Sequence, residues 1–154
     1  ELRNLLEPGS KWEWSLEGIH WAAGIAPLGY GDRKVATSIA PDGEKPRSAY
    51  FRSTFHIVDA AAVSRLFFNV QADDGCIIML NGKEVIRHNV PEGEVSRQTL
   101  APKRVVFLRE KMMVPLPVDA QFLQTGTNRV EVQVFQTAAD SSDLIFDLGV
   151  QIKE

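Results

Sequence analysis

Residues 72–85, ADDGCIIMLNGKEV, set two adjacent acids before an apolar run that ends in Asn-Gly. Asn81-Gly82 lies between the segments CIIML and KEVIR, and an Asn-Gly pair in this position is the strongest short-range signal for a two-residue β-hairpin. Both residues of such a turn need a positive φ, and Asn and Gly tolerate it best. The Asp-Asp-Gly that precedes the run is also typical of a turn, because an aspartate accepts hydrogen bonds from nearby backbone amides. The stretch therefore predicts short strands joined by tight turns.

Other parts of the chain show the pattern of strands with one buried face. Residues 49–57 (AYFRSTFHI), 129–136 (RVEVQVFQ) and 143–152 (DLIFDLGVQI) alternate apolar and polar side chains with period two. The region 119–124 is expected to form one helical turn. No window carries a long helical stripe, so we predict an all-β jelly-roll β-sandwich of two antiparallel sheets with roughly eight to ten strands. The remaining strand candidates are 10–16, 34–39, 65–72, 76–81, 83–88, 103–108 and 111–116.

Composition limits the class of protein. A chain of 154 residues with 44% hydrophobic and 24% charged residues fits one globular domain, so we expect residues 1–154 to form a single domain taken from a longer chain. The net charge of −3 gives no general attraction to nucleic acid or to anionic lipid. No apolar run approaches the roughly 20 residues that a membrane span needs. A single cysteine, Cys76, excludes an internal disulfide, and we expect it to be a small buried apolar residue.

The order of these motifs resembles the galactose-binding-domain-like β-sandwiches, which are jelly rolls. The sugar-binding domain of family 2 glycoside hydrolases is similar in having a hairpin with an Asn-Gly turn and a later Gly-x-Asn turn before a strand. Here these are Asn81-Gly82 and Gly126-Thr127-Asn128, and WAAGIAPLGYGD (21–32) is similar to a segment near the start of uncharacterised modules of secreted bacterial proteins. The resemblance implies a non-catalytic accessory domain of a larger secreted bacterial protein, outside the cell or on its surface, with a glycan or polysaccharide and neighbouring domains as partners.

Asp73 and Asp74 have two interpretations. Their carboxylates could bind a structural calcium ion, but calcium takes six to eight oxygen ligands, so Asp32, Asp143 or Asp147 would have to come near. The favoured alternative is a turn in which the acids brace a loop and pair with Arg52 or Arg87. No cofactor other than this calcium ion is expected.

Sugar-binding residues are expected in two loops. Trp21 and Tyr30 lie in the Gly-rich segment 21–32, where an exposed aromatic ring could stack on a sugar. Arg87, His88 and Asn89 open the polar segment 87–104, which we expect to be a long loop near Asp73 and Asp74 at one end of the sandwich. Trp12 and Trp14 are two residues apart and share one face of a strand, where a core position is favoured over a stacking platform.

Catalysis by this domain is not expected. The three histidines are far apart in sequence, and adjacent acids in one turn rarely place two carboxylates across a cleft as glycosidases require. Three functions are ranked: a carbohydrate-binding or substrate-presenting accessory domain; a structural or adhesive docking module without a sugar ligand; and, last, a small hydrolase. A resemblance of fold is an analogy, because jelly rolls host many unrelated functions.

Overall fold

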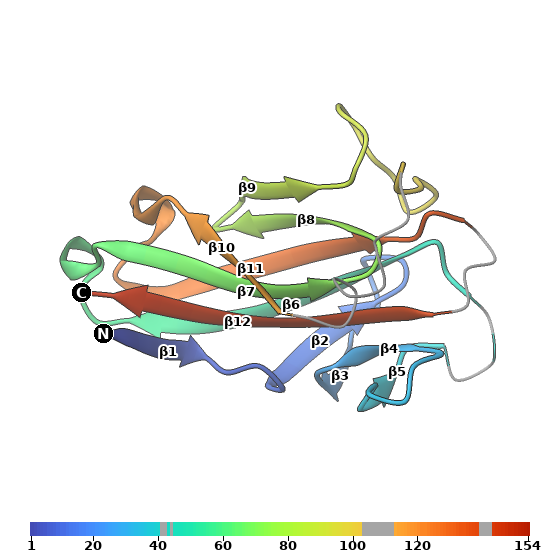
Figure 1. The fold of residues 1–154 in the computed structure, drawn as a ribbon, viewed down its shortest axis with the longest axis horizontal. Coiled ribbons are helices and arrows are strands. Elements are labelled where there is room, and N and C mark those ends of the chain that lie inside the picture. Colours follow the sequence, from blue (N-terminus) through green and yellow to red (C-terminus); the bar gives the residue numbers. More distant parts are fainter. Residues whose placement is uncertain (41–42, 44, 103–112, 139–142) are drawn as a thin grey trace.

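The protein is a sandwich of two six-stranded sheets, seen in a computed structural model that describes residues 1–40, 43, 45–102, 113–138 and 143–154 (Figure 1). Sheet A runs β10-β7-β12-β4-β5, and β1 also pairs with β12. Its strands are β1 (Leu2–Leu6), β4 (Leu28–Tyr30), β5 (Thr37–Ser38), β7 (Arg65–Ala72), β10 (Val114–Val118) and β12 (Leu144–Lys153). Sheet B runs β3-β2-β6-β11-β8-β9. Its strands are β2 (Lys11–Ser15), β3 (Ala22–Ile25), β6 (Ser48–Ile57), β8 (Gly75–Leu80), β9 (Lys83–His88) and β11 (Gly126–Phe135).

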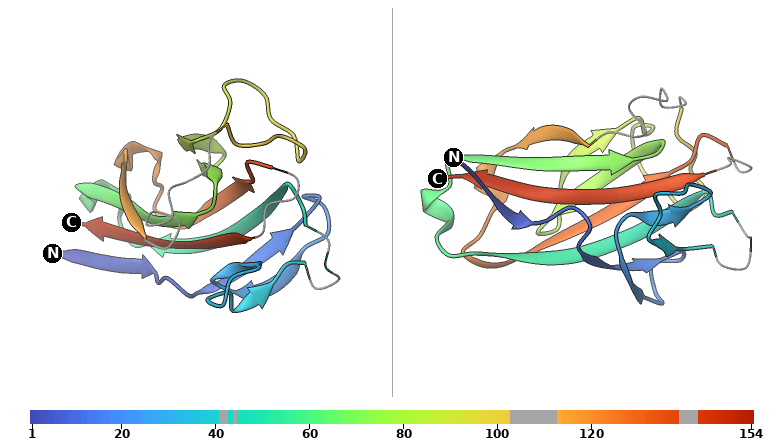
Figure 2. Two further views of the ribbon diagram at one scale, coloured as in Figure 1. Left: turned by 45° about the vertical axis from the view of Figure 1, so that its right-hand side comes forward. Right: turned by 60° about the horizontal axis from the view of Figure 1, so that its bottom comes forward.

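The predicted all-β sandwich is confirmed, with differences in the short strands. The pairings are antiparallel except for β4 with β5, and the chain ends lie side by side because β1 pairs with the end of β12 (Figure 2). A 3-10 helix at Ala120–Phe122 confirms the predicted helical turn, and another lies at Ala60–Ala62. Strands β1, β3 and β4 were not predicted, the region 34–39 gives only β5, and the candidate 103–108 lies outside the described residues.

The predicted hairpin is confirmed, whereas the Asp-Asp-Gly turn makes a different connection. Strands β8 and β9 pair across Asn81-Gly82, where φ is 51° and 83°. Strand β7, however, belongs to sheet A and β8 to sheet B. Residues 73 and 74 therefore carry the chain from one sheet to the other. Crossings of this kind also follow β1, β3, β5, β6, β9, β10 and β11, so the chain passes repeatedly between the two sheets.

The two Asn turns that carry the family resemblance meet in space. The Asn81 amide group donates to the Asn128 side-chain oxygen at 2.9 Å and to the Phe122 carbonyl at 2.9 Å. Asn128 is fully buried, and its amide group donates to the carbonyls of Gln124 (2.7 Å) and Gly126 (3.1 Å). A buried amide is stable only when its donors and acceptors are satisfied. Asn128 thus joins the β8–β9 hairpin to the turn that precedes β11.

The core fills the space between the sheets with alternate residues of the long strands. Trp12 is buried at 1% exposure and Trp14 packs against the core from a partly buried position, so the core interpretation of both is confirmed. Phe146 of β12 stacks on Phe51 of β6 with ring centroids 4.3 Å apart, and meets the Trp12 ring edge-on at 5.0 Å. The other large buried side chains of this core are Phe68, Leu28, Ile39, Ile57, Leu66, Ile78, Leu80 and Leu144.

Cys76 is expected to be chemically silent in the folded protein. The side chain is 1% exposed on the inner face of β8, which confirms the predicted burial, and burial raises the pKa of its thiol to about 12. The thiolate is the reactive species, so both access and ionisation oppose reaction at pH 8. We expect no titration by Ellman's reagent within minutes under native conditions and one thiol per chain in denaturant. Rapid native labelling would contradict this burial.

Candidate functional site: a groove on the outer face of sheet B

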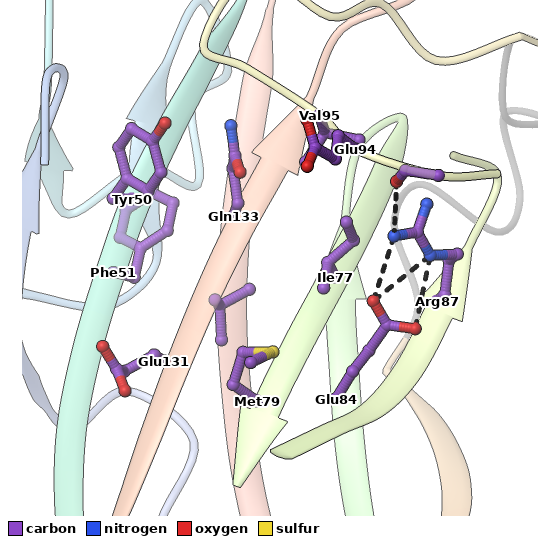
Figure 3. Close-up of a pocket in the computed structure, with 12 residues that line it drawn as sticks. Tyr50, Phe51, Ile77, Met79, Glu84, Arg87, Glu94, Val95, Glu131 and Gln133 are labelled. Carbon is purple, nitrogen blue, oxygen red and sulfur yellow. Dashed lines mark hydrogen bonds and ion pairs between the residues drawn. The ribbon is translucent and has the colours of Figure 1, made fainter. Parts of the chain in front are cut away.

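Strands β6, β11, β8 and β9 turn alternate side chains outward, and these form the floor and one wall of a groove of about 350 Å³ (Figure 3). Cross-strand register sets two rows. Tyr50, Gln133, Ile77 and Arg87 face one another in one row. The other row consists of Glu131, Met79 and Glu84, which are neighbours across β11, β8 and β9. Gly93, Glu94 and Val95 overhang the groove from the connection that follows β9.

A bulge in β9 builds the wall of the groove. Regular alternation would turn Glu84 and Arg87, three residues apart, to opposite faces. The register shifts between Ile78 and Met79, so that Val85 is the extra residue and both charged side chains point outward. Arg87 Nη2 lies 3.0 Å from Glu84 Oε1 and 3.1 Å from the Gly93 carbonyl, and Nη1 donates to the Pro91 carbonyl. Arg87 therefore ties the overhanging connection to β9.

The connection after β9 is held on the sheet by apolar and polar contacts. Ala101 packs with Ile77 and Phe135 in a small outer cluster, against which Met79, Val90 and Val95 also pack. The Gln133 amide group donates to the Ser96 carbonyl at 3.2 Å, and the Ser48 hydroxyl donates to the Arg97 carbonyl at 2.8 Å. Of the long polar loop predicted for residues 87–104, Arg87 and His88 belong instead to β9, and residues 89–102 form the connection that lies on the outer face of sheet B.

Tyr50 forms the side of the groove opposite the Glu84–Arg87 pair (Figure 3). Its ring is half-buried on the outer face of β6. A Cβ at Gly18 would lie 3.7 Å from two carbons of this ring, an ordinary van der Waals distance. With a φ of 83°, Gly18 takes a conformation that favours glycine, so the chain can run against the ring. The Tyr50 ring therefore packs near Gly18 and lines the groove.

A second hollow of about 340 Å³ lies beside the groove on the same face, lined by charged side chains of β2, β6 and β11. Arg52 pairs with Glu13 at 2.9 Å, and Arg129 pairs with Glu131 at 3.0 Å. The Arg52 guanidinium also lies 3.9 Å from the centre of the Trp21 ring, a cation–π arrangement. Trp21 is half-buried, and one face of its ring is covered by the Arg52 guanidinium.

The structure separates the residues that the sequence grouped as a sugar site. Trp21 lies by the second hollow and Arg87 by the groove, while His88 is exposed and lines neither. Asn89, with a φ of 52°, donates from its amide group to the Asp74 carbonyl at 3.3 Å. Ligand contact by these residues stays a prediction.

The expected exposure of Tyr30 is wrong. Only 7% of the residue is exposed, and its hydroxyl accepts a hydrogen bond from the Gln136 amide group at 2.6 Å and donates to the Pro46 carbonyl at 3.3 Å. Burial raises the pKa of this hydroxyl, against the lowering effect of the Gln136 hydrogen bond. Tyr30 is buried because it belongs to β4, which pairs with β12, so that this part of the Gly-rich segment is a strand of sheet A. Tyr30 is therefore part of the interior and no platform for a ligand.

Asp73 and Asp74 are buried, and Asp74 braces a loop, as the favoured interpretation predicts. They are 2% and 4% exposed. The Asp74 carboxylate accepts from the Thr137 backbone N–H at 3.0 Å and from the Thr137 hydroxyl at 3.2 Å, which secures the segment after β11. The predicted partners Arg52 and Arg87 pair with Glu13 and Glu84 instead.

No calcium site is visible in the described part of the chain, where no group of three or more His, Cys, Asp or Glu side chains could hold a metal ion. Asp147, one of the additional ligands that calcium would need, accepts from the backbone N–H groups of Gly9 (3.1 Å) and Leu148 (2.8 Å). Burial raises the pKa of Asp147, while these hydrogen bonds lower it. Its carboxylate secures the connection between β1 and β2.

Comparison with known proteins supports the fold. No protein-family model matches the chain, and no curated protein matches its sequence. Solved structures do match. The β-D-glucuronidase of Dictyoglomus thermophilum has a TM-score of 0.58 at 14% identity, over 99% of this chain and 28% of the enzyme. The β-glucuronidase of an uncultured Clostridium sp. has a TM-score of 0.59 at 13% identity, over 99% and 29%. The β-D-mannosidase of D. thermophilum has a TM-score of 0.54 at 15% identity, over 88% and 16%.

The chain shares its fold with part of these glycosidases. This confirms, at the level of the fold, the resemblance to a domain of family 2 glycoside hydrolases. The chain spans less than a third of the length of each of the three enzymes.

The groove itself could be recognised from the sequence only in part. The outward direction of Glu131 and Gln133 on β11 follows from alternation. That β8 and β9 continue the same face, and that a bulge turns Glu84 toward the groove, depends on pairing between distant segments and has no local signal.

Proposed function

We propose that this chain is a non-catalytic carbohydrate-binding domain of a larger glycan-acting protein outside the cell, and that the groove on sheet B is its ligand site. The observation that carries the proposal is the groove beside Tyr50. The groove is lined by an aromatic ring, the Gln133 side chain and several carboxylates. Its volume lies near the lower end of the range for small-molecule binding sites, which is about 300–1,000 Å³. The shared fold with a part of glycosidases, and the small share of those enzymes that it covers, support an accessory role.

The side chains suit the chemistry of a sugar ring. One face of a pyranose carries apolar C–H groups that can lie on an aromatic ring such as Tyr50. Sugar hydroxyls donate and accept hydrogen bonds, and the groove offers carboxylate acceptors at Glu84, Glu94 and Glu131. It also offers the side-chain oxygen of Gln133, whose amide nitrogen already donates to Ser48 and Ser96. The groove is formed by strands, and Arg87 and Ser48 secure the chain that overhangs it, so little ordering is needed on binding.

Binding of the purified chain to a glycan array, followed by titration of the best ligand, tests the proposal. We expect Tyr50→Ala to weaken binding about fivefold to tenfold, because an aromatic contact in a binding site often contributes about 1 kcal/mol or more. His56→Ala is the matched control, since His56 is an exposed outward residue of β6 that lines neither hollow. An array without reproducible ligands, or equal losses in the two variants with unchanged melting temperatures, would overturn the proposal.

A docking module without a sugar ligand is the second candidate function, favoured by the second hollow. Its charged side chains are already paired with one another, as in the Glu13–Arg52 and Arg129–Glu131 pairs, and Trp21 stacks on Arg52. Such a surface could rest on a neighbouring domain of the same protein. The array separates the two candidates, because docking alone predicts no glycan binding.

A further inference from the structure

We infer that the groove on sheet B takes uncharged sugars and discriminates against uronic acids and other anionic sugars. The inference rests on the proposed function and concerns the charges that line the groove. Among the described residues these are three carboxylates, Glu84, Glu94 and Glu131, and one cation, Arg87. The groove will disfavour an anionic sugar if Arg87 is already paired within the protein and at least one of the three carboxylates has no cationic partner.

Arg87 is engaged in contacts within the protein. Its Nε lies 3.3 Å from both Glu84 carboxylate oxygens, Nη2 lies 3.0 Å from Oε1, and Nη1 and Nη2 donate to the carbonyls of Pro91 and Gly93. A guanidinium binds a carboxylate best through two parallel N–H donors on one edge. Each of its three nitrogens already donates to Glu84 or to the overhanging chain. A sugar carboxylate would have to displace either Glu84 or the Pro91 and Gly93 carbonyls to gain this contact.

The other two carboxylates leave the groove acidic. Glu131 is paired at 3.0 Å with Arg129, whose side chain is exposed and lines the second hollow. Glu94 is exposed at the rim of the groove and has no ion-pair partner among the described residues. A carboxylate accepts hydrogen bonds and donates none, so it suits the hydroxyl groups of a neutral sugar and repels a second carboxylate. The lining therefore favours sugars without charge.

Matched pairs of ligands isolate the charge. One pair is p-nitrophenyl β-D-glucopyranoside and p-nitrophenyl β-D-glucuronide, which differ only in that the glucuronide has a carboxylate in place of a hydroxymethyl group. The corresponding galactoside and galacturonide form a second pair with the same difference. We expect NMR titration at low ionic strength to give affinity about five to ten times weaker for the acid of a pair, as one like charge near the site predicts. The difference should shrink at about 0.5 M salt, because screening shortens the range of the repulsion.

A variant assigns the effect to the groove. Glu94→Gln should narrow the difference within a pair, while Glu154→Gln, which removes the same charge from the C-terminal residue far from the groove, should leave it unchanged. Equal or tighter binding of the acids would overturn this inference and leave the proposed function standing. Binding of neither member of either pair, together with an array without ligands, would overturn the proposed function and the inference with it.

Discussion

Replacing Phe146 with alanine is expected to lower the free energy of unfolding by about 3–5 kcal/mol, the usual cost of truncating a fully buried phenylalanine. Phe146 is completely buried, and it is the residue of β12 through which sheet A meets two aromatic rings of sheet B, Phe51 and Trp12. The loss combines the transfer energy of the ring with the cavity it leaves, and surrounding strands close such a cavity only in part. Urea unfolding followed by tryptophan fluorescence measures it, since Trp12 lies at the site.

Phe146→Leu is the matched control for the cavity. It keeps most of the volume and removes the aromatic contacts, so we expect a loss of about 1–1.5 kcal/mol. A loss below about 1 kcal/mol for Phe146→Ala would mean that the core closes over the site, contrary to its packing density. The difference between the two variants separates volume from aromatic geometry.

The alternation in residues 143–152 is sufficient to place Phe146 on the buried face of a strand, but it does not identify Phe51 and Trp12 as its neighbours. Period-two patterns report which face of a strand is apolar, and strand order depends on contacts between distant segments. The same limit applies to β1, β3 and β4. Each has only three to five residues, and β3 and β4 lie in the Gly-rich segment 21–32, which has the composition of a loop.

In the candidate site, too, the partners of individual side chains could not be predicted from the sequence. Arg87 is a polar residue next to a hairpin, and the sequence predicts that it binds a ligand or pairs with Asp73 or Asp74. Its actual partner, Glu84, is three residues away and would be excluded by regular alternation; the bulge at Val85 brings the two together. Asn81 and Asn128 are the opposite case. Both belong to recognisable turn motifs, but only the fold shows that their side chains meet.

Replacing Gly29 with alanine is expected to destabilise the protein by at least about 3 kcal/mol, the upper end of the range for overpacking. A Cβ at this position would lie 1.8 Å from the Leu144 carbonyl oxygen and 2.7 Å from its carbonyl carbon. These are main-chain atoms of β12, which cannot turn aside as a flexible side chain would. Relief requires separation of β4 from β12, and β4 also carries the buried Leu28 and receives a hydrogen bond from Ile39 N–H to the Gly29 carbonyl at 2.9 Å.

Gly126→Ala serves as the control for Gly29→Ala, because it tests backbone conformation without a steric clash. Gly126 has a φ of 97°, and no heavy atom lies within 4 Å of the added Cβ, so we expect a loss of about 1–2 kcal/mol from the unfavourable backbone alone. Chemical denaturation of both variants compares the two effects. Equal losses would show that the approach of β4 to β12 is not tight. A much larger loss at Gly29 would establish that this glycine is required by contact between strands, in a segment whose composition otherwise suggests a loop.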